Sequence, residues 1–142
     1  MTDREKRELL LQDLSARVPF GVIAKCGQDK DPVTIKLVDF EDEQVCTSHY
    51  LCWDSIDIIK PYLRPLSSMT EEERKEMSAA IQRDRVEPYG EIKSSGVDNL
   101  LLCTARQATN LIVWFNMKHF DYRGLIEKGL AIAVTENNNP YK

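Results

Sequence analysis

The sequence predicts an α+β fold: a small antiparallel sheet, arranged as a meander, packed by an N-terminal helix and by a core helix in the C-terminal half, with one further helix at the periphery. Two patterns predict this fold. Leucines recur at helical spacing near the N-terminus, and apolar and polar residues alternate from 33 to 37. We expect a single domain over residues 1–135 and a flexible tail over residues 136–142.

The N-terminal helix is predicted by its cap, its apolar stripe and its end. Thr2 and Glu5 have the spacing of a capping box, in which each side chain accepts a hydrogen bond from the other residue's backbone N–H. The apolar stripe that follows consists of Leu10, Leu11, Leu14 and Val18. The helix should end near Pro19, which cannot continue it, and Gly21, which favours a turn.

Three candidate strands follow the helix, at residues 20–26, 33–40 and 45–53. In the second, Val33, Ile35 and Leu37 alternate with polar residues, which is typical of a strand with one buried face. Short polar loops join the three runs, and such loops usually connect neighbouring antiparallel strands. The three strands are therefore predicted to form the meander.

A connector and a peripheral helix open the second half of the chain. Residues 60–65 contain two prolines and are interpreted as a rigid, extended connector that Tyr62 and Leu63 hold against the core. The isoleucines before it, at 56, 58 and 59, either end a strand or form one helical turn. Thr70 then caps a helix over residues 71–83. The apolar stripe of this helix is thin, so we expect the helix to lie at the surface.

The core helix of the C-terminal half is predicted over residues 105–118, after a loop and a short buried strand at 100–103. The apolar face of this helix consists of Ala108, Leu111, Ile112 and Phe115, and is widened by Trp114 and Met117. A last helical turn at 125–128, ended by Gly129, and a short strand at 131–134 complete the expected elements.

Composition excludes several classes of protein. With 42% apolar and 30% charged residues, the chain of 142 residues is expected to be globular. Its net charge is −4 and its basic residues are scattered, so no nucleic-acid partner is expected. No apolar run is long enough to span a bilayer and the first residues do not form a signal peptide, so we expect a cytoplasmic protein with reduced cysteines and no membrane partner.

Two constellations of reactive side chains were considered as sites. Cys46, His49 and Cys52 are of the residue types that bind zinc. On one strand, however, Cys46 and Cys52 would share a face but lie far apart, and His49 would point to the opposite face, so no metal or other cofactor is expected. Cys103 with His119 is a conceivable nucleophilic pair, but the sequence marks no third group to orient it. We therefore expect a protein that is not an enzyme.

The densest group of chemically versatile side chains surrounds residues 114–123, with Asp121 as a turn former. Trp, Tyr and Arg are favoured in binding hot spots. An Asp-Tyr-Arg-Gly turn has a local structural use at every position, however, and we favour the structural interpretation, in which Arg123 fixes the C-terminal segment against the core. The candidate binding residues are Trp114, His119, Tyr122 and Arg123, with Tyr62 and Arg64 from the connector.

Three stretches of the chain together resemble a known family. They are LLLQDLSARVPFGV (9–22), IIKPYLRPLSSMTEEE (58–73), and WFN (114–116) with HFDYRGLIEKGLA (119–131). In this order they resemble a family of small uncharacterised proteins of Bacteroides-type gut bacteria and their phages or mobile elements. The resemblance implies a bacterial or phage origin and carries no activity with it.

These observations lead to one expected function and two alternatives. We expect a noncatalytic, phage- or mobile-element-associated protein that binds another protein, from the host or the phage. The first alternative is a binder of a small anionic ligand, such as a nucleotide signal sequestered in anti-defence. The second is an unrecognised enzyme.

Overall fold

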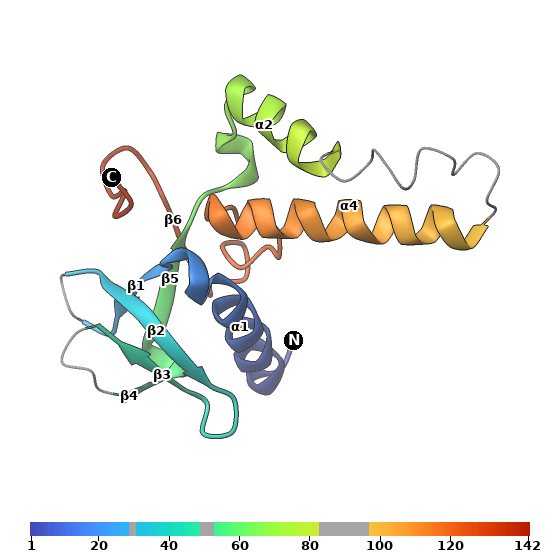
Figure 1. Cartoon of the computed structure of the whole chain (residues 1–142). Helices are drawn as coiled ribbons and strands as arrows, with labels where there is room; N and C mark the ends of the chain where they lie inside the picture. Colours follow the sequence, from blue (N-terminus) through green and yellow to red (C-terminus); the bar gives the residue numbers. More distant parts are fainter. Residues whose placement is uncertain (29–30, 49–52, 83–96) are drawn as a thin grey trace. The chain divides into compact units, whose positions relative to one another are not determined.

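The computed structural model describes residues 1–28, 31–48, 53–82 and 97–142, and the chain divides into two compact units (Figure 1). Met1–Leu66 and His119–Lys142 form the first unit, and Ser67–Lys118 form the second. This division runs through the region for which the sequence predicts one domain, residues 1–135. Residues 136–142, predicted to be a flexible tail, belong to the first unit.

The first unit is built on one sheet of six strands in the order β4-β3-β2-β1-β5-β6. The strands are β1 (Ile23–Cys26), β2 (Val33–Asp39), β3 (Gln44–Thr47), β4 (Trp53–Ser55), β5 (Ile59–Leu63) and β6 (Ile132–Ala133). All neighbouring pairs are antiparallel except β5 and β6, which are parallel. The predicted α+β class and its antiparallel meander are confirmed, as is the short last strand.

The predicted third strand, residues 45–53, is wrong as a single element. β3 ends at Thr47 and β4 begins at Trp53, and the two strands pair antiparallel with Cys46 opposite Trp53. Residues 49–52, between them, lie outside the described residues. The segment contains neither Gly nor Pro, so its composition gave no signal for two strands in place of one.

The predicted connector at residues 60–65 is instead largely strand β5, in the interior of the sheet. Of the two alternatives for the isoleucines before it, the helical turn is found, as a short 3-10 helix, η2 (Ile56–Ile58). The backbone N–H of Gly27 donates to the Ile58 carbonyl at 2.8 Å, which sets the phase of the β1–β5 ladder. Because hydrogen-bonded pairs alternate in an antiparallel ladder, Pro61, opposite Ala24, falls where a residue's N–H points away from β1. Its missing N–H therefore costs no hydrogen bond with β1.

Helix α1 (Asp3–Arg17) lies against one face of the sheet (Figure 1) and supplies much of the core. Its predicted capping box is confirmed: the Thr2 hydroxyl accepts from the Glu5 N–H at 3.1 Å, and the Glu5 carboxylate accepts from the Thr2 N–H at 2.6 Å. The core cluster joins α1 to four of the strands and consists of Leu10, Leu11, Leu14, Val22, Ala24, Cys26, Val33, Ile35, Val45, Ile56, Ile59, Leu63, Leu125 and Ala131. A 3-10 turn, η1 (Val18–Phe20), ends the helix as predicted.

In the second unit, helices α2 (Glu71–Gln82) and α4 (Val97–Met117) pack against each other, and Lys118 Nζ lies 3.1 Å from the Glu76 carboxylate. The Thr70 hydroxyl accepts from the Glu73 N–H at 3.2 Å, which is the predicted cap of α2. None of the described side chains of α2 is buried, in agreement with a peripheral helix.

One expectation about α4 is wrong and another holds only in part. Residues 100–103, predicted to be a strand, belong to this helix, because an apolar run of four residues does not distinguish the two structures. The predicted apolar face is partly buried: Trp114 is buried and Leu111 and Phe115 are half-buried, whereas Ala108 and Ile112 are exposed. No described residue of α4 belongs to the core cluster of the first unit.

Candidate functional site

The segment after His119 folds as a capped turn. The Asp121 carboxylate accepts hydrogen bonds from the N–H groups of Leu125, at 2.8 Å, and Ile126, at 3.0 Å. The turn then closes as predicted at Gly129, which has a φ of 73° and whose N–H donates to the Ile126 carbonyl. The N–H of Leu130 donates to the Leu125 carbonyl at 2.9 Å, which completes the pattern of a helix C-terminus.

A fully buried ion pair on α1 meets this segment. The side chains of Asp13 and Arg17 both have 0% exposure, and Arg17 Nε lies 2.8 Å from Asp13 Oδ2. Arg17 Nη2 donates both to Asp13 Oδ1, at 3.2 Å, and to the carbonyl of Phe120, at 2.7 Å. One guanidinium therefore joins the last turn of α1 to a residue more than 100 positions later in the chain.

Arg123 adds a second cation to the same carboxylate. Its Nε lies 3.3 Å from Asp13 Oδ1, a charge contact in which the N–H is not directed at the oxygen, and its Nη2 donates to the Tyr122 hydroxyl at 3.3 Å. The guanidiniums of Arg17 and Arg123 each lie 5.2 Å from the centre of the Tyr122 ring. Burial raises the pKa of the Asp13 carboxyl, and both arginines oppose that shift.

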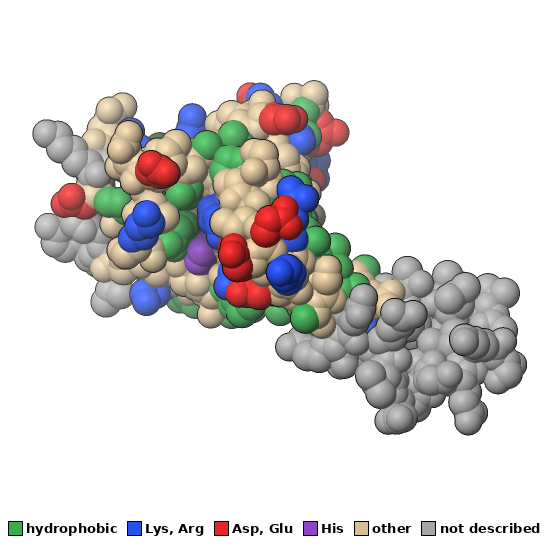
Figure 2. All heavy atoms as spheres, turned by 90° about the horizontal axis from the view of Figure 1, so that it is seen from above, with side chains coloured by type: hydrophobic (Ala, Val, Ile, Leu, Met, Phe, Trp, Pro, Cys, Tyr) green, Lys and Arg blue, Asp and Glu red, His purple; other side chains and the backbone are tan. Residues whose placement is uncertain are grey.

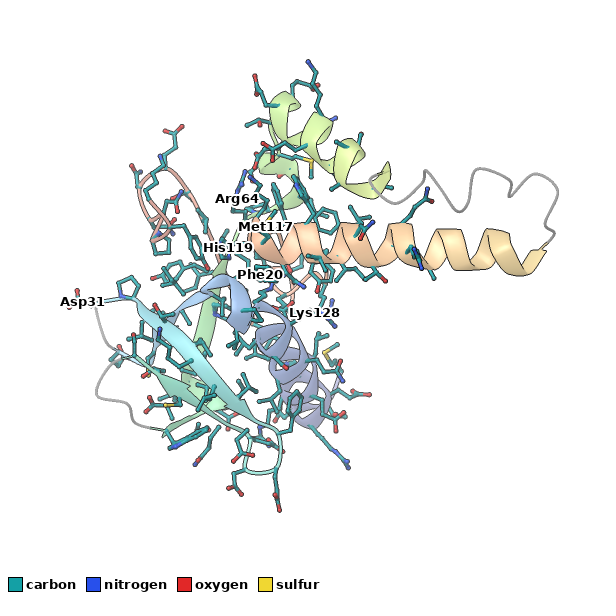
Figure 3. All side chains as sticks on the ribbon, in the orientation of Figure 1. Phe20, Asp31, Arg64, Met117, His119 and Lys128 are labelled. Carbon is teal, nitrogen blue, oxygen red and sulfur yellow. The ribbon has the colours of Figure 1, made fainter. Side chains whose placement is uncertain are left out.

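Arg64 connects the end of β5 to this group (Figure 3). Its N–H donates to the His119 carbonyl at 2.8 Å, and its carbonyl accepts from the Asp121 N–H at 2.9 Å, which makes a parallel bridge with Phe120. Its guanidinium lies 4.2 Å above the centre of the Phe120 ring. β5, α1 and the C-terminal segment therefore meet around Phe120.

His119 and Tyr141 form the outer layer of this region. Their rings stack with centroids 3.7 Å apart, and the Tyr141 hydroxyl donates to the Tyr62 carbonyl at 2.7 Å and accepts from the Ile23 N–H at 3.1 Å. Burial, together with the positive charges of Arg17 and Arg64, lowers the pKa of His119 to about 4. His119, the histidine within the described residues, still reaches the surface (Figure 2).

Five of the six predicted binding residues belong to this region, which we name the Asp13 cluster. It consists of Asp13, Arg17, Tyr62, Arg64, His119, Phe120, Asp121, Tyr122, Arg123 and Tyr141. The sixth, Trp114, belongs to the second unit, where it is buried and its ring centre lies 5.8 Å from that of Phe115. The contacts of the Asp13 cluster join α1, β5 and the C-terminal segment of the same chain, which is the geometry of a structural role.

A second feature, which sequence reasoning missed, is an apolar row on the outer face of the sheet. Leu37 on β2 and Trp53 on β4 both lie opposite Cys46 on β3, so the three side chains share one face. Cys46 is buried, whereas Leu37 is 56% and Trp53 47% exposed. Leu37 was expected to face the core together with Ile35, but the register of β2 shifts between them, which turns Leu37 outward.

The segment that carries this row is acidic. From Leu37 to Asp57 the sequence contains no Lys or Arg, and its acidic residues are Asp39, Glu41, Asp42, Glu43, Asp54 and Asp57. Arg7 contacts two of them, Glu43 at 3.7 Å and Asp57 at 2.8 Å. Phe40, in the turn between β2 and β3, is 52% exposed. We name the surface formed by Leu37, Phe40 and Trp53 with the neighbouring acidic residues the hairpin face. That this segment has acidic residues and no basic ones could have been found from the sequence.

A pocket of about 340 Å³ lies between α1, η2, β5 and the turn at Gly129. Leu10, Ile56 and Ile59 give it an apolar wall, whereas its charged residues carry both signs: Asp3, Lys6, Arg7, Asp57 and Lys60. The Arg7 guanidinium is already engaged by Asp57 through two hydrogen bonds, at 2.8 and 3.2 Å. Apart from that pair, the lining has two lysines and one carboxylate, so its net positive charge is small.

The residues considered for catalysis and metal binding are only partly described. His49, Cys52 and the side chain of Cys103 lie outside the described residues, and Cys46 is buried. Within the described part of the chain, His, Cys, Asp and Glu form no group of three or more suited to a metal ion. In that same part, no helix has the length and apolar character needed to cross a bilayer.

Comparison with known proteins found no match: no family model, no curated protein and no solved structure is similar to this chain.

The buried Asp13–Arg17 pair should be costly to break from one side. Asp13→Leu leaves a buried guanidinium without its carboxylate, and we expect it to lower the free energy of unfolding by about 3–5 kcal/mol. The double variant Asp13→Leu/Arg17→Met removes both charges and should lose less than the single variant, although the Phe120 carbonyl loses its donor. Denaturant unfolding of both variants beside the parent protein measures this.

The matched control lies on the same helix. Arg4 and Glu8 are also an Arg–carboxylate pair four residues apart, at 3.1 Å, but they are exposed. Glu8→Leu should change the free energy of unfolding by less than about 0.5 kcal/mol. If Asp13→Leu costs no more than Glu8→Leu, the buried pair does not have the role described here.

His119 should make the stability depend on pH between about 6.5 and 4. The unfolded chain binds a proton on His119 near pH 6.5, whereas the folded protein does so only near pH 4. Lowering the pH through this window therefore favours unfolding, and the stabilisation is complete only above it. Asn tolerates the φ of 65° at this position, so His119→Asn is the suitable variant.

The measurement is the free energy of unfolding of the parent protein and of His119→Asn from pH 7.5 to 4. The difference between the two should shift in favour of the variant as the pH falls, and the contribution of Asp13, common to both proteins, cancels. Two parallel curves would contradict the lowered pKa of His119.

Proposed function

We propose that this protein is a noncatalytic binding protein and that its partner is another protein with a basic, partly apolar surface, which the hairpin face contacts. The observation that carries the proposal is the pair of exposed side chains of Leu37 and Trp53, in one cross-strand row on a segment that has only acidic charges.

The chemistry of the hairpin face suits a protein partner. Tryptophan is enriched among the residues that dominate interface energetics, and Trp53 shares one face of the sheet with the exposed Leu37, with Cys46 between them on β3. Phe40, in the turn between β2 and β3, is a further exposed aromatic residue. Charged residues around an apolar centre contribute to the rate of association and to the choice of partner rather than to raw affinity. Asp39, Glu41 and Asp42 occupy that position next to Phe40.

The acidic residues of the hairpin face disfavour a second copy of the chain or a nucleic acid as the partner. Two copies of the chain that met through this face would bring like charges together, and the phosphates of a nucleic acid would be repelled. The pocket near Lys6 carries both signs, so a small anion is supported less well than a protein. We take this partner to be a protein of the host or the phage, the origin that the sequence resemblance implies.

The first experiment identifies the partner by crosslinking from a defined position on the hairpin face. A photo-crosslinking amino acid at position 40 should capture one protein from the host, whereas the same amino acid at the exposed position 12 on α1 should not. The captured protein is identified by mass spectrometry, purified and titrated. We expect it to be basic, and its association rate should fall as salt is raised.

The variants then test the face itself. Trp53→Ser and Leu37→Ser should weaken the purified complex at least tenfold, with an unchanged free energy of unfolding within about 0.5 kcal/mol because both side chains are exposed. Leu66→Ser is the control, because Leu66 is an exposed leucine of the same unit, at 45%. Equal affinities for Leu37→Ser and Leu66→Ser, or an acidic partner, would contradict the proposal.

A further inference from the structure

The outer edge of β4 is open within the described residues, where β4 pairs with β3 alone. The phase of this ladder is fixed by one bond, from the Ile56 N–H to the Glu43 carbonyl at 3.0 Å. Hydrogen-bonded pairs alternate in an antiparallel ladder, so the next such pair is Val45 with Asp54. The N–H and C=O groups of the two flanking residues, Trp53 and Ser55, therefore point away from β3.

The side chains at this edge also alternate. Trp53 lies on the outer face with Leu37, whereas Asp54, opposite the core residue Val45, lies on the other face. A strand added at this edge would place every second side chain beside Trp53 and those between them on the side of Asp54. Apolar residues suit the first positions and basic residues the second, because the segment from Leu37 to Asp57 has no cation.

We propose that the partner contacts the hairpin face with an extended segment, alternately apolar and basic, that pairs through its backbone with the open edge of β4. This inference rests on the proposed function and specifies its binding mode. Strand addition of this kind draws its affinity from backbone hydrogen bonds and its specificity from alternate side chains. The outward groups of Trp53 and Ser55 supply the bonds, and the Leu37–Trp53 row supplies the apolar contact.

Ser55 allows the edge to be tested without changing the face. Its φ is −61°, the value that proline fixes, and the residue before it is already in a strand, so Ser55→Pro removes one outward N–H with little strain. The substitution also removes the Ser55 hydroxyl, which accepts from the Asp57 N–H at 3.2 Å. Ser55→Ala removes the same hydroxyl and keeps the N–H, and it is therefore the matched control.

The probe is a capped synthetic peptide, (Lys-Val)5, titrated into the ¹⁵N-labelled full chain. We expect shifts of the β4 and β3 amides, equal affinity within about twofold for the parent and Ser55→Ala, and at least a tenfold loss for Ser55→Pro. The same peptide with N-methyl groups on alternate valines cannot form the edge pairing and should not bind the parent protein. This second arm needs no variant to fold.

The outcomes separate the binding mode from the function. If Trp53→Ser loses the peptide but Ser55→Pro and the N-methylated peptide bind normally, the hairpin face is used without its edge and the inference is wrong. If the parent protein does not bind the peptide, or forms a dimer that Ser55→Pro abolishes, the proposed occupant is wrong. Strand addition is supported if Ser55→Pro loses the unmodified peptide and the parent protein does not bind the N-methylated peptide.

Discussion

The buried ion pair between Asp13 and Arg17 is the interaction that holds the C-terminal segment of the first unit, from His119 onward, to α1. A charge with no exposure is tolerated only when its partners are close and well oriented, and here one guanidinium serves both a carboxylate and the Phe120 carbonyl. Arg123 approaches the same carboxylate from the C-terminal segment. These contacts fix the position of the segment from His119 onward against α1. We expect the buried pair to favour this one arrangement of the segment more than it adds to the net free energy of unfolding.

The Asp13 cluster lies at the edge of the sheet that β6 closes. Once Phe120 is held beside Arg64, the chain turns at Asp121 and returns β6 to the edge of β5. The Tyr141 hydroxyl then bonds backbone groups of both β1 and β5. The opposite edge, at β4, has no such cover within the described residues, and it is there that the exposed Trp53 and the acidic segment lie. The candidate binding residues predicted from the sequence, apart from Trp114, belong to the closed side, and the proposed interface to the open one.

The sequence predicted what depends on near neighbours. The capping boxes at Thr2 and Thr70, the turn at Asp121 and the end at Gly129 each rest on residues within a few positions of each other, and the structure contains all of them. The meander was also predictable, because short loops join its strands.

What the sequence could not reveal depends on register and on distant partners. The apolar residues change parity from Leu37 to Val38, but this change alone does not show that the register of β2 shifts there and turns Leu37 outward. Nothing near Pro61 shows that its N–H would point away from β1. Asp13 and Arg17 have the spacing of an ordinary surface pair on a helix, as Arg4 and Glu8 do. Only the position of Phe120 in space makes the first pair a buried junction.

Amide hydrogen exchange in Arg17→Met tests this account most directly, because exchange reports stability segment by segment. The amides of Leu125 and Val134, bonded to Asp121 and Leu63, should lose at least tenfold protection relative to the parent protein. The amide of Ile35, bonded to Val22, should lose much less. Unchanged protection at Leu125 and Val134, or an equal loss at all three amides, would contradict the claim that the buried pair locks the C-terminal segment onto α1 and the sheet.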